Sequence, residues 1–279
     1  MTYTCFDISI EDQIAHLILS RPEKRNAMNR EFWTELPAII QDIDANSKAR
    51  VVVISSTGPH FTSGIDIAAF ATDPSSRTKE QRLQAGAKFH GEVRRMQQTF
   101  SCLENCRLPV LVAIQGGCIG GGVDLITACD MRYGTADSFI TIFETMIGMT
   151  ADVGTFPRIT KLIPEGIARD LAYTGRRMMA DECKETGLFN QVFATQEQMM
   201  TAVMAKAKEI AARAPLAIMG CKRIINYSRD HSTDDTLDYI ATWNASMLLQ
   251  EEIVEAVTAN KEKRDGNFVD RPKLTGFID

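Results

Sequence analysis

The sequence lacks the features of a membrane-spanning or secreted chain. No run of about 18 apolar residues occurs, so no transmembrane helix is expected. The first residues, MTYTCFDISIEDQ, contain neither a basic n-region nor an apolar h-region, and the last residues, LTGFID, match no lipid-anchor or targeting signal. These absences predict a cytoplasmic protein without a membrane partner, with a mitochondrial or peroxisomal location as the alternative.

The chain also lacks a large excess of either charge and lacks a recognisable metal motif. It has 31 Lys+Arg against 36 Asp+Glu, a net charge of −5, which argues against nucleic acid as a partner. Its seven cysteines are odd in number and scattered, which predicts free thiols in a reducing compartment. Cys102 and Cys106 stand one helical turn apart, but no two further ligands follow at a recognisable spacing, so no metal site is expected.

Several catalytic and nucleotide-binding motifs are missing as well. No G-x-S-x-G occurs and the chain has only four histidines, which makes a hydrolase a weak interpretation. Val123 follows Gly121-Gly122 where a P-loop needs lysine, and Leu125 stands where a dinucleotide fingerprint needs its third glycine. The glycine-rich stretch GGCIGGGVD (116–124) is therefore not a standard phosphate cradle.

What is present is an alternation of strand-like and helix-like segments, which predicts an α/β fold. Two strand-like runs open the chain as an expected hairpin, and a helical pattern interrupted by Pro37 follows through about Asp44. Beyond about Ala151 the pattern is mainly helical. The expected strands cover 4–10, 13–20, 51–55, 110–115, a short pair within 132–142, and a segment near 189–193; a further helix covers roughly 83–104, after a polar segment 72–82 that is expected to be mobile.

The last helical pattern, roughly 236–263, carries a broad apolar face. Its apolar residues are Leu237, Ile240, Trp243, Met247, Leu248, Ile253, Val254 and Val257. Such a face either packs on the chain's own domain or forms a subunit contact, and the sequence favours neither.

Two buried strands are each followed by a glycine-containing loop, FTSGIDI (61–67) and GGCIGGGVD (116–124). Ligands of open α/β folds bind at strand ends, and glycine lets backbone N–H groups approach a ligand closely. One amide from each loop would form a two-point clamp on a developing oxyanion. The alternative is that the glycines serve tight turns or close helix–strand packing.

Three acidic residues lie in apolar surroundings near these loops: Asp124, Glu144 and Asp152. Each alone has a structural explanation, since Asp124 could favour a helix N-terminus and Asp152 could be an N-cap. No Lys or Arg occurs between Arg107 and Arg132 or between Arg132 and Arg158. Carboxyl groups buried without cationic partners have raised pKa values and can exchange protons near neutral pH.

These segments together resemble the crotonase (enoyl-CoA hydratase/isomerase) superfamily. The resemblance rests on RPEKRNAMN, FTSGID, GGCIGGGVDLITACD, FET…MTADVGT, MMADE and YSRDHSTDDTLDYIATWN, and it covers essentially the whole chain. It implies a crotonase-like spiral of ββα units in residues 1–200, and a C-terminal helical region for trimerisation in residues 201–279. It also implies a homotrimer, or a homohexamer built as a dimer of trimers.

The resemblance implies a role for each candidate residue. The amides of Ile65 and Gly121 would form the oxyanion hole for a thioester carbonyl. Within the superfamily, the three acids resemble those of dienoyl-CoA isomerases, which convert 3,5-dienoyl-CoA to 2,4-dienoyl-CoA in fatty acid β-oxidation. Coenzyme A (CoA) would arrive as part of an acyl-CoA substrate, with no metal, nicotinamide or flavin. The implied CoA-binding residues are Lys24, Arg25, Ser63, Gly64, Ile65, Asp66, Ile67 and Gly121, joined by Lys261, Lys263 or Arg264 of a neighbouring subunit.

In that chemistry, Glu144 takes a proton from C2, Asp152 delivers one to C6, and Asp124 orients or polarises the pocket. The segment 72–90 is expected to contribute to the wall of the acyl tunnel. The nearest alternative is a 2-enoyl-CoA hydratase, which needs two carboxylates but not a third. A Δ3-Δ2 enoyl-CoA isomerase needs fewer acids, and a non-catalytic, RNA-binding homologue is disfavoured by the net charge of −5.

Overall fold

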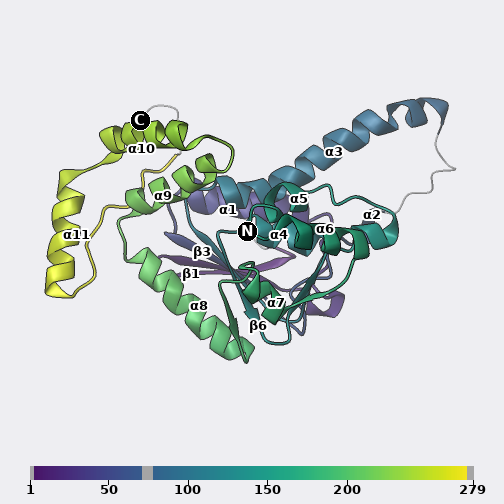
Figure 1. Ribbon diagram of the computed structural model, residues 1–279, viewed down its shortest axis with the longest axis horizontal. Coiled ribbons are helices and arrows are strands. Elements are labelled where there is room, and N and C mark those ends of the chain that lie inside the picture. Colours follow the sequence, from purple (N-terminus) through teal and green to yellow (C-terminus); the bar gives the residue numbers. More distant parts are fainter. Residues whose placement is uncertain (1–2, 71–77, 275–279) are drawn as a thin grey trace.

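A six-stranded sheet and a three-stranded sheet organise the chain (Figure 1). The computed structural model describes residues 3–70 and 78–274. In the large sheet every neighbouring pair is parallel except β1–β2. Its order is β1 (Phe6–Glu11), β2 (Ile14–Leu19), β3 (Val51–Ser56), β4 (Val110–Ile114), β6 (Met131–Thr135) and β9 (Gln191–Phe193). The small sheet has the order β5 (Gly117–Ile119), β7 (Phe139–Thr141) and β8 (Met178–Met179).

The expected hairpin is confirmed as β1 and β2, which pair antiparallel. Asp12 and Gln13 connect the strands, with φ values of 49° and 64°. Positive φ at both central residues matches the right-handed twist of paired strands, as in the common two-residue hairpin turns.

The chain winds as a spiral between the two sheets. β4 and β6 lie in the large sheet, and the strands that directly follow them, β5 and β7, lie in the small sheet. The segment after β3 does the same, because Thr62 forms a parallel bridge to Cys118 of β5. In each turn of the spiral, the chain therefore leaves the end of a strand in the large sheet and continues along the small sheet. This is the ββα spiral that the resemblance implied.

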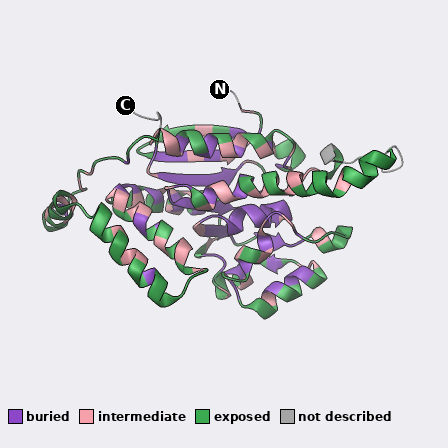
Figure 2. Cartoon of the chain, turned by 90° about the horizontal axis from the view of Figure 1, so that it is seen from above, coloured by how far each residue is buried: buried purple, intermediate pink, exposed green. Residues whose placement is uncertain are grey.

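Helices cover the two faces of the large sheet. One face packs against α8 (Gln196–Ala211), through Met199, Val203 and Ala207. The other face packs against α1 (Phe32–Ala45) and the C-terminal part of α3 (Lys79–Asn105), and Phe32 and Phe100 meet there with ring centroids 6.2 Å apart. Pro37 lies inside α1 without ending it. Figure 2 shows the strands buried between these layers and the N-terminal part of α3 exposed.

The expected single helix over 236–263 is wrong. Two helices occur instead, α10 (Thr233–Met247) and α11 (Gln250–Glu262), and Leu248 between them has an extended conformation. They follow α9 (Pro215–Ser228) at one end of the molecule (Figure 1). Most of the apolar face is exposed: Leu237, Met247, Leu248, Leu249, Ile253, Val254 and Val257. Packing on the chain's own domain therefore does not explain that face.

Two other expectations concern segment boundaries. The proposed division between residues 200 and 201 falls inside α8, which packs on the large sheet, and the division stays a prediction. Of the polar segment 72–82, residues 72–77 lie outside the described part, and 79–82 begin α3.

No helix in the described ranges is long and apolar enough to cross a membrane.

Candidate active site

Two glycine-containing loops meet at the edge of the small sheet. Met28 forms a parallel bridge to Ile65, in which the Met28 amide donates to the Gly64 carbonyl and the Asp66 amide donates to the Met28 carbonyl. Ile65 lies between the two bonded residues, Gly64 and Asp66, so in this parallel bridge its own N–H points away from Met28. The Ile65 amide therefore faces the second loop, where a Cβ placed on Gly121 would lie 3.6 Å from the Ile65 nitrogen.

The Gly121 amide lies at the start of α4 (Gly121–Thr127), where the first N–H groups of a helix have no partner within the helix. Gly120 precedes it as the N-cap, with φ of 52°. The two loops thus bring the Ile65 and Gly121 amides close together; their role as an oxyanion hole stays a prediction. Two convergent donors are what a developing oxyanion requires.

Glycine at position 64 is a steric necessity. Its φ is +84°, and a Cβ there would lie 2.6 Å from the Ile119 carbonyl oxygen and 3.3 Å from the Gly121 nitrogen. Such contacts would push the two loops apart. The structure therefore favours the close approach of the loops as the reason for this glycine, over a simple turn.

Asp124 is almost fully buried in the first turn of α4, with an exposed fraction of 1%. Its Oδ1 accepts a hydrogen bond of 2.6 Å from the Thr155 amide, the first residue of α5 (Thr155–Ile159). Burial raises the pKa of Asp124 to about 7, and the negative charge of Glu144 adds to the effect. The pKa of this carboxyl group is therefore far above that of an exposed aspartate.

Glu144 begins a 3₁₀ turn, Glu144–Ile147, directly beside the glycine cluster. A Cβ on Gly120 would lie 3.2 Å from its Oε1, and its buried Oε2 has no hydrogen-bond partner among the described residues. Burial raises its pKa, and the charge of Asp152 raises it further. An unpaired buried carboxylate oxygen is costly for folding and is typical of a group that awaits a substrate.

Asp152 is half-buried in the loop before α5. The structural alternative, that Asp152 is an N-cap, is wrong, because Gly154 is the N-cap of α5 and Asp124 supplies the acceptor for the first amide. Burial raises the pKa of Asp152, and its charge acts on both Glu144 and Asp124. It also lines a hollow of about 430 Å³ between α3 and α5, together with Gln97, Ser101 and Arg158.

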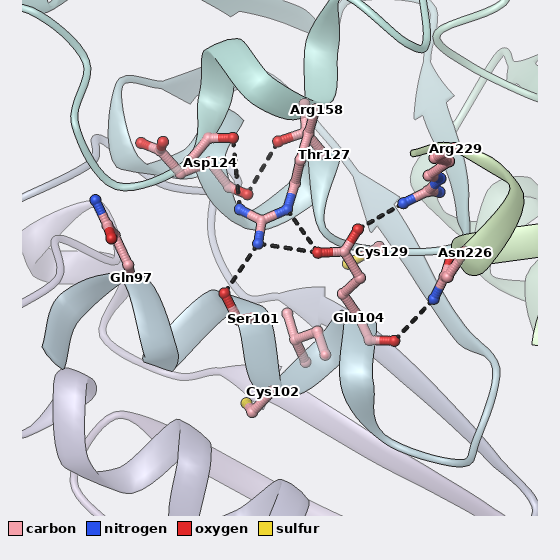
Figure 3. A network of polar contacts seen from close by, with 12 residues as sticks. Gln97, Ser101, Cys102, Glu104, Asp124, Thr127, Cys129, Arg158, Asn226 and Arg229 are labelled. Atoms are coloured by element: carbon pink, nitrogen blue, oxygen red, sulfur yellow. Dashed lines mark hydrogen bonds and ion pairs between the residues drawn. The ribbon is translucent and has the colours of Figure 1, made fainter. Parts of the chain in front are cut away.

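The three acids are thus brought into one electrostatic cluster, and none of them has a salt bridge within the described residues. The nearby Arg158 is engaged elsewhere: its guanidinium pairs with Glu104 at 3.1 Å and donates to Ser101 (Figure 3). Burial raises the pKa of all three carboxyl groups, and no salt bridge within the described residues opposes that effect.

The expected CoA-binding residues lie around the loop 61–67. The Ser63 amide donates to the Arg25 carbonyl at 2.9 Å, which places the exposed Lys24–Arg25 turn beside this loop. Ile67 is exposed at the start of α2 (Ile67–Phe70). Lys261, Lys263 and Arg264 are exposed at the end of α11, and their role in a neighbouring subunit stays a prediction.

The sequence analysis missed Asn26, which ties these loops together. Its side-chain amide donates to the carbonyls of Thr57 and His60, and its carbonyl accepts from the Thr62 hydroxyl at 2.7 Å. Asn26 is buried with φ of 52°. The available signal was an asparagine in a polar turn, since asparagine tolerates this left-handed conformation better than most residues.

Comparisons with known proteins show what this chain is similar to. The Enoyl-CoA hydratase/isomerase family model matches residues 9–271. The mitochondrial Δ(3,5)-Δ(2,4)-dienoyl-CoA isomerase of Rattus norvegicus is 44% identical over 95% of this chain and 82% of its own length. The peroxisomal Δ(3,5)-Δ(2,4)-dienoyl-CoA isomerase of Arabidopsis thaliana is 37% identical over 92% of this chain and 93% of its own. The structure of an enoyl-CoA hydratase from Bacillus anthracis superimposes with a TM-score of 0.84, at 25% identity, over 97% of this chain and 100% of that one.

The chain therefore belongs to the enoyl-CoA hydratase/isomerase family.

Proposed function

We propose that the protein is a Δ3,5-Δ2,4-dienoyl-CoA isomerase that acts in fatty acid β-oxidation. The observation that carries the proposal is the cluster of Asp124, Glu144 and Asp152, three carboxyl groups with raised pKa values beside the paired amides of Ile65 and Gly121. The names of the relatives from rat and Arabidopsis support the same reaction.

The reaction removes a proton from C2 of the acyl chain and adds a proton at C6. In our proposal the Glu144 carboxylate accepts the C2 proton, and the electrons shift to give a conjugated dienolate. Its charge reaches the thioester oxygen, where the amides of Ile65 and Gly121 donate to it; each such donor typically contributes about 2.7–4 kcal/mol of transition-state stabilisation. The protonated Asp152 then delivers a proton to C6, and exchange with solvent restores both acids.

The raised pKa values of Glu144 and Asp152 favour these two proton transfers. A carboxyl group whose pKa lies near the working pH can both accept and release a proton with a small driving force. Burial raises the pKa of Glu144 and of Asp152. In our proposal Asp124 orients or polarises the pocket, and the hydrogen bond from the Thr155 amide to its Oδ1 supports a fixed position for this group.

The second candidate is a 2-enoyl-CoA hydratase, which requires two carboxylates that hold a water over C2–C3. The pairing of Asp124 with the Thr155 amide argues against that role, because one of its oxygens is already occupied. The chemistry proposed here moves only protons, so it needs no metal, nicotinamide or flavin beyond the acyl-CoA substrate. We also propose a homotrimer or homohexamer without an RNA partner, which the exposed apolar face of α10 and α11 and the net charge of −5 support.

The state of the cysteines indicates the kind of cell compartment in which the protein acts. All seven are free thiols, which supports a reducing compartment. Our proposal is the cytoplasm, with mitochondria or peroxisomes, the compartments in the names of the two relatives, as the alternative.

The test compares 3,5-dienoyl-CoA with crotonyl-CoA as substrates. We expect the ultraviolet band of the more conjugated 2,4-dienoyl thioester to appear with the first, at a kcat/KM at least about 100-fold above that for crotonyl-CoA hydration. Asp152→Asn should abolish isomerisation but keep deuterium exchange at C2, whereas Glu144→Gln should stop both. Faster hydration than isomerisation would overturn the proposal, and loss of C2 exchange in Asp152→Asn would overturn the assignment of the two acids.

A further inference from the structure

The segment that carries Asp152 has little backbone support. Gly148, with φ of 75°, and Gly154, with φ of 136°, flank it. Outside helices and strands, no described backbone–backbone hydrogen bond involves residues 150–153. A segment of this kind needs side chains from elsewhere to fix its position, because its own peptide groups do not pair with a neighbouring strand.

One side chain from α3 supplies that support. The Gln97 Nε2 donates to the Asp152 carbonyl oxygen at 2.7 Å, and its Oε1 accepts from Arg94 at 2.8 Å. With both ends of the amide bonded, its orientation is defined: the N–H group faces the loop. Gln97 is half-buried on the C-terminal part of α3, which packs in the core against α1 through Phe100 and Leu103.

The same face of α3 holds the far end of the segment. Ser101 and Glu104 follow Gln97 at helical spacing and bind the Arg158 guanidinium (Figure 3). Arg158 in turn donates to the Gly154 carbonyl at 3.4 Å. Gly154 is thus anchored through Arg158 and through α5, whereas at Asp152 itself the described side-chain contact to the backbone comes from Gln97.

We propose that Gln97 is a positioning residue for Asp152, which sets the distance between the acid and C6 of the substrate. This inference rests on the proposed isomerase function. Gln97 contacts the main chain of Asp152 and not the reacting atoms, so it acts only through Asp152. A misplacement of about 1 Å can cost about 100-fold in rate, which is why one hydrogen bond to the backbone matters here.

The test replaces Gln97 with methionine, which keeps the length of the side chain and removes the donor. We expect kcat for isomerisation to fall by about 10- to 100-fold, with KM changed less than threefold, while C2 deuterium exchange stays within threefold of the wild type. If Gln97 served only the stability of the fold, its replacement would lower C2 exchange and isomerisation together. Gln97→Glu, which is close in shape but only accepts hydrogen bonds when ionised, should show the same separation.

Gln98→Met is the matched control, because Gln98 lines the same hollow but makes no bond to residues 150–154 among the described contacts. It should leave both rates unchanged. Equal losses of exchange and turnover in Gln97→Met and Gln97→Glu, or no loss in either, would overturn the inference while the proposed function stood. A wild-type protein that fails to isomerise 3,5-dienoyl-CoA would overturn the proposed function itself and the inference with it.

Discussion

At the scale of single residues, Asp124 shows how one buried carboxyl group serves both the fold and the site. Its Oδ1 accepts from the Thr155 amide and so satisfies the start of α5. Burial raises its pKa from 3.8 to about 7. Burial therefore opposes deprotonation of Asp124. Because the charged form is costly in the folded protein, the free energy of unfolding should fall as the pH rises and Asp124 ionises.

Asp124→Asn should reduce that loss. A raised pKa contributes stability fully below about pH 4, and the contribution is lost as the pH rises through about 7. The rise of the Asp124 pKa from 3.8 to about 7 corresponds to at most about 4 kcal/mol in the free energy of unfolding. Asparagine keeps an acceptor for the Thr155 amide but carries no charge. We expect the variant to exceed the wild type in free energy of unfolding at pH 8, with a smaller difference at pH 5.

The measurement is urea unfolding at both pH values and at one protein concentration, since assembly would add its own stabilisation. Asp137→Asn, at an exposed aspartate, is the control and should follow the wild-type pH dependence. A variant that loses stability between pH 5 and pH 8 as steeply as the wild type would show that Asp124 is not the group responsible.

At the scale of elements, the oxyanion clamp depends on how closely two loops approach. Gly64→Ala would place a Cβ 2.6 Å from the Ile119 carbonyl oxygen at a φ of +84°. The Ile65 amide would then be displaced from the Gly121 amide, and we expect kcat to fall by about 100- to 1000-fold, the usual effect of losing one oxyanion donor. Steady-state kinetics on 3,5-dienoyl-CoA measures the loss.

Gly166→Ala provides the matched control for that change. Gly166 lies in α6 (Glu165–Thr174), and nothing lies within 4 Å of a Cβ built there. Alanine should leave kcat unchanged and stabilise the helix by about 0.5–1 kcal/mol. Circular dichroism at the assay temperature must show both variants folded. Wild-type kcat in folded Gly64→Ala would contradict the clamp.

The sequence was sufficient to predict the elements with strong local patterns. Glycines after β3 and β4 and acids in apolar surroundings predicted the clamp and the three carboxyl groups, and their catalytic roles stay predictions. The contacts of Gln97 and Asn26 were not predictable, because they join residues 55 and 31 positions apart through side chains without a local pattern. The break between α10 and α11 was missed because Leu248 and Leu249 continue the apolar pattern that a helix would show.

At the scale of the whole molecule, one end of the chain is unlike the rest. Figure 2 shows buried strands at the centre and exposed helices at the periphery. Helices α10 and α11 expose large apolar side chains as well as polar ones. Val257 has an exposed fraction of 63% and Val254 one of 55%. Exposed apolar side chains gathered on two helices are typical of a surface that contacts another protein, and they support the proposed trimer or hexamer.

Val257→Asp should therefore weaken assembly. A subunit contact over α11 would bury the new carboxylate in apolar surroundings, and every 1.4 kcal/mol of that penalty weakens association about tenfold. We expect light scattering after size-exclusion chromatography to give the trimer or hexamer mass for the wild type and a smaller mass for the variant at micromolar concentration. Thr201→Asp adds the same charge at an exposed position of α8 and should keep the wild-type mass. An unchanged mass in Val257→Asp would mean that subunits meet through another surface, and a monomeric wild type would mean that this apolar face has a different partner.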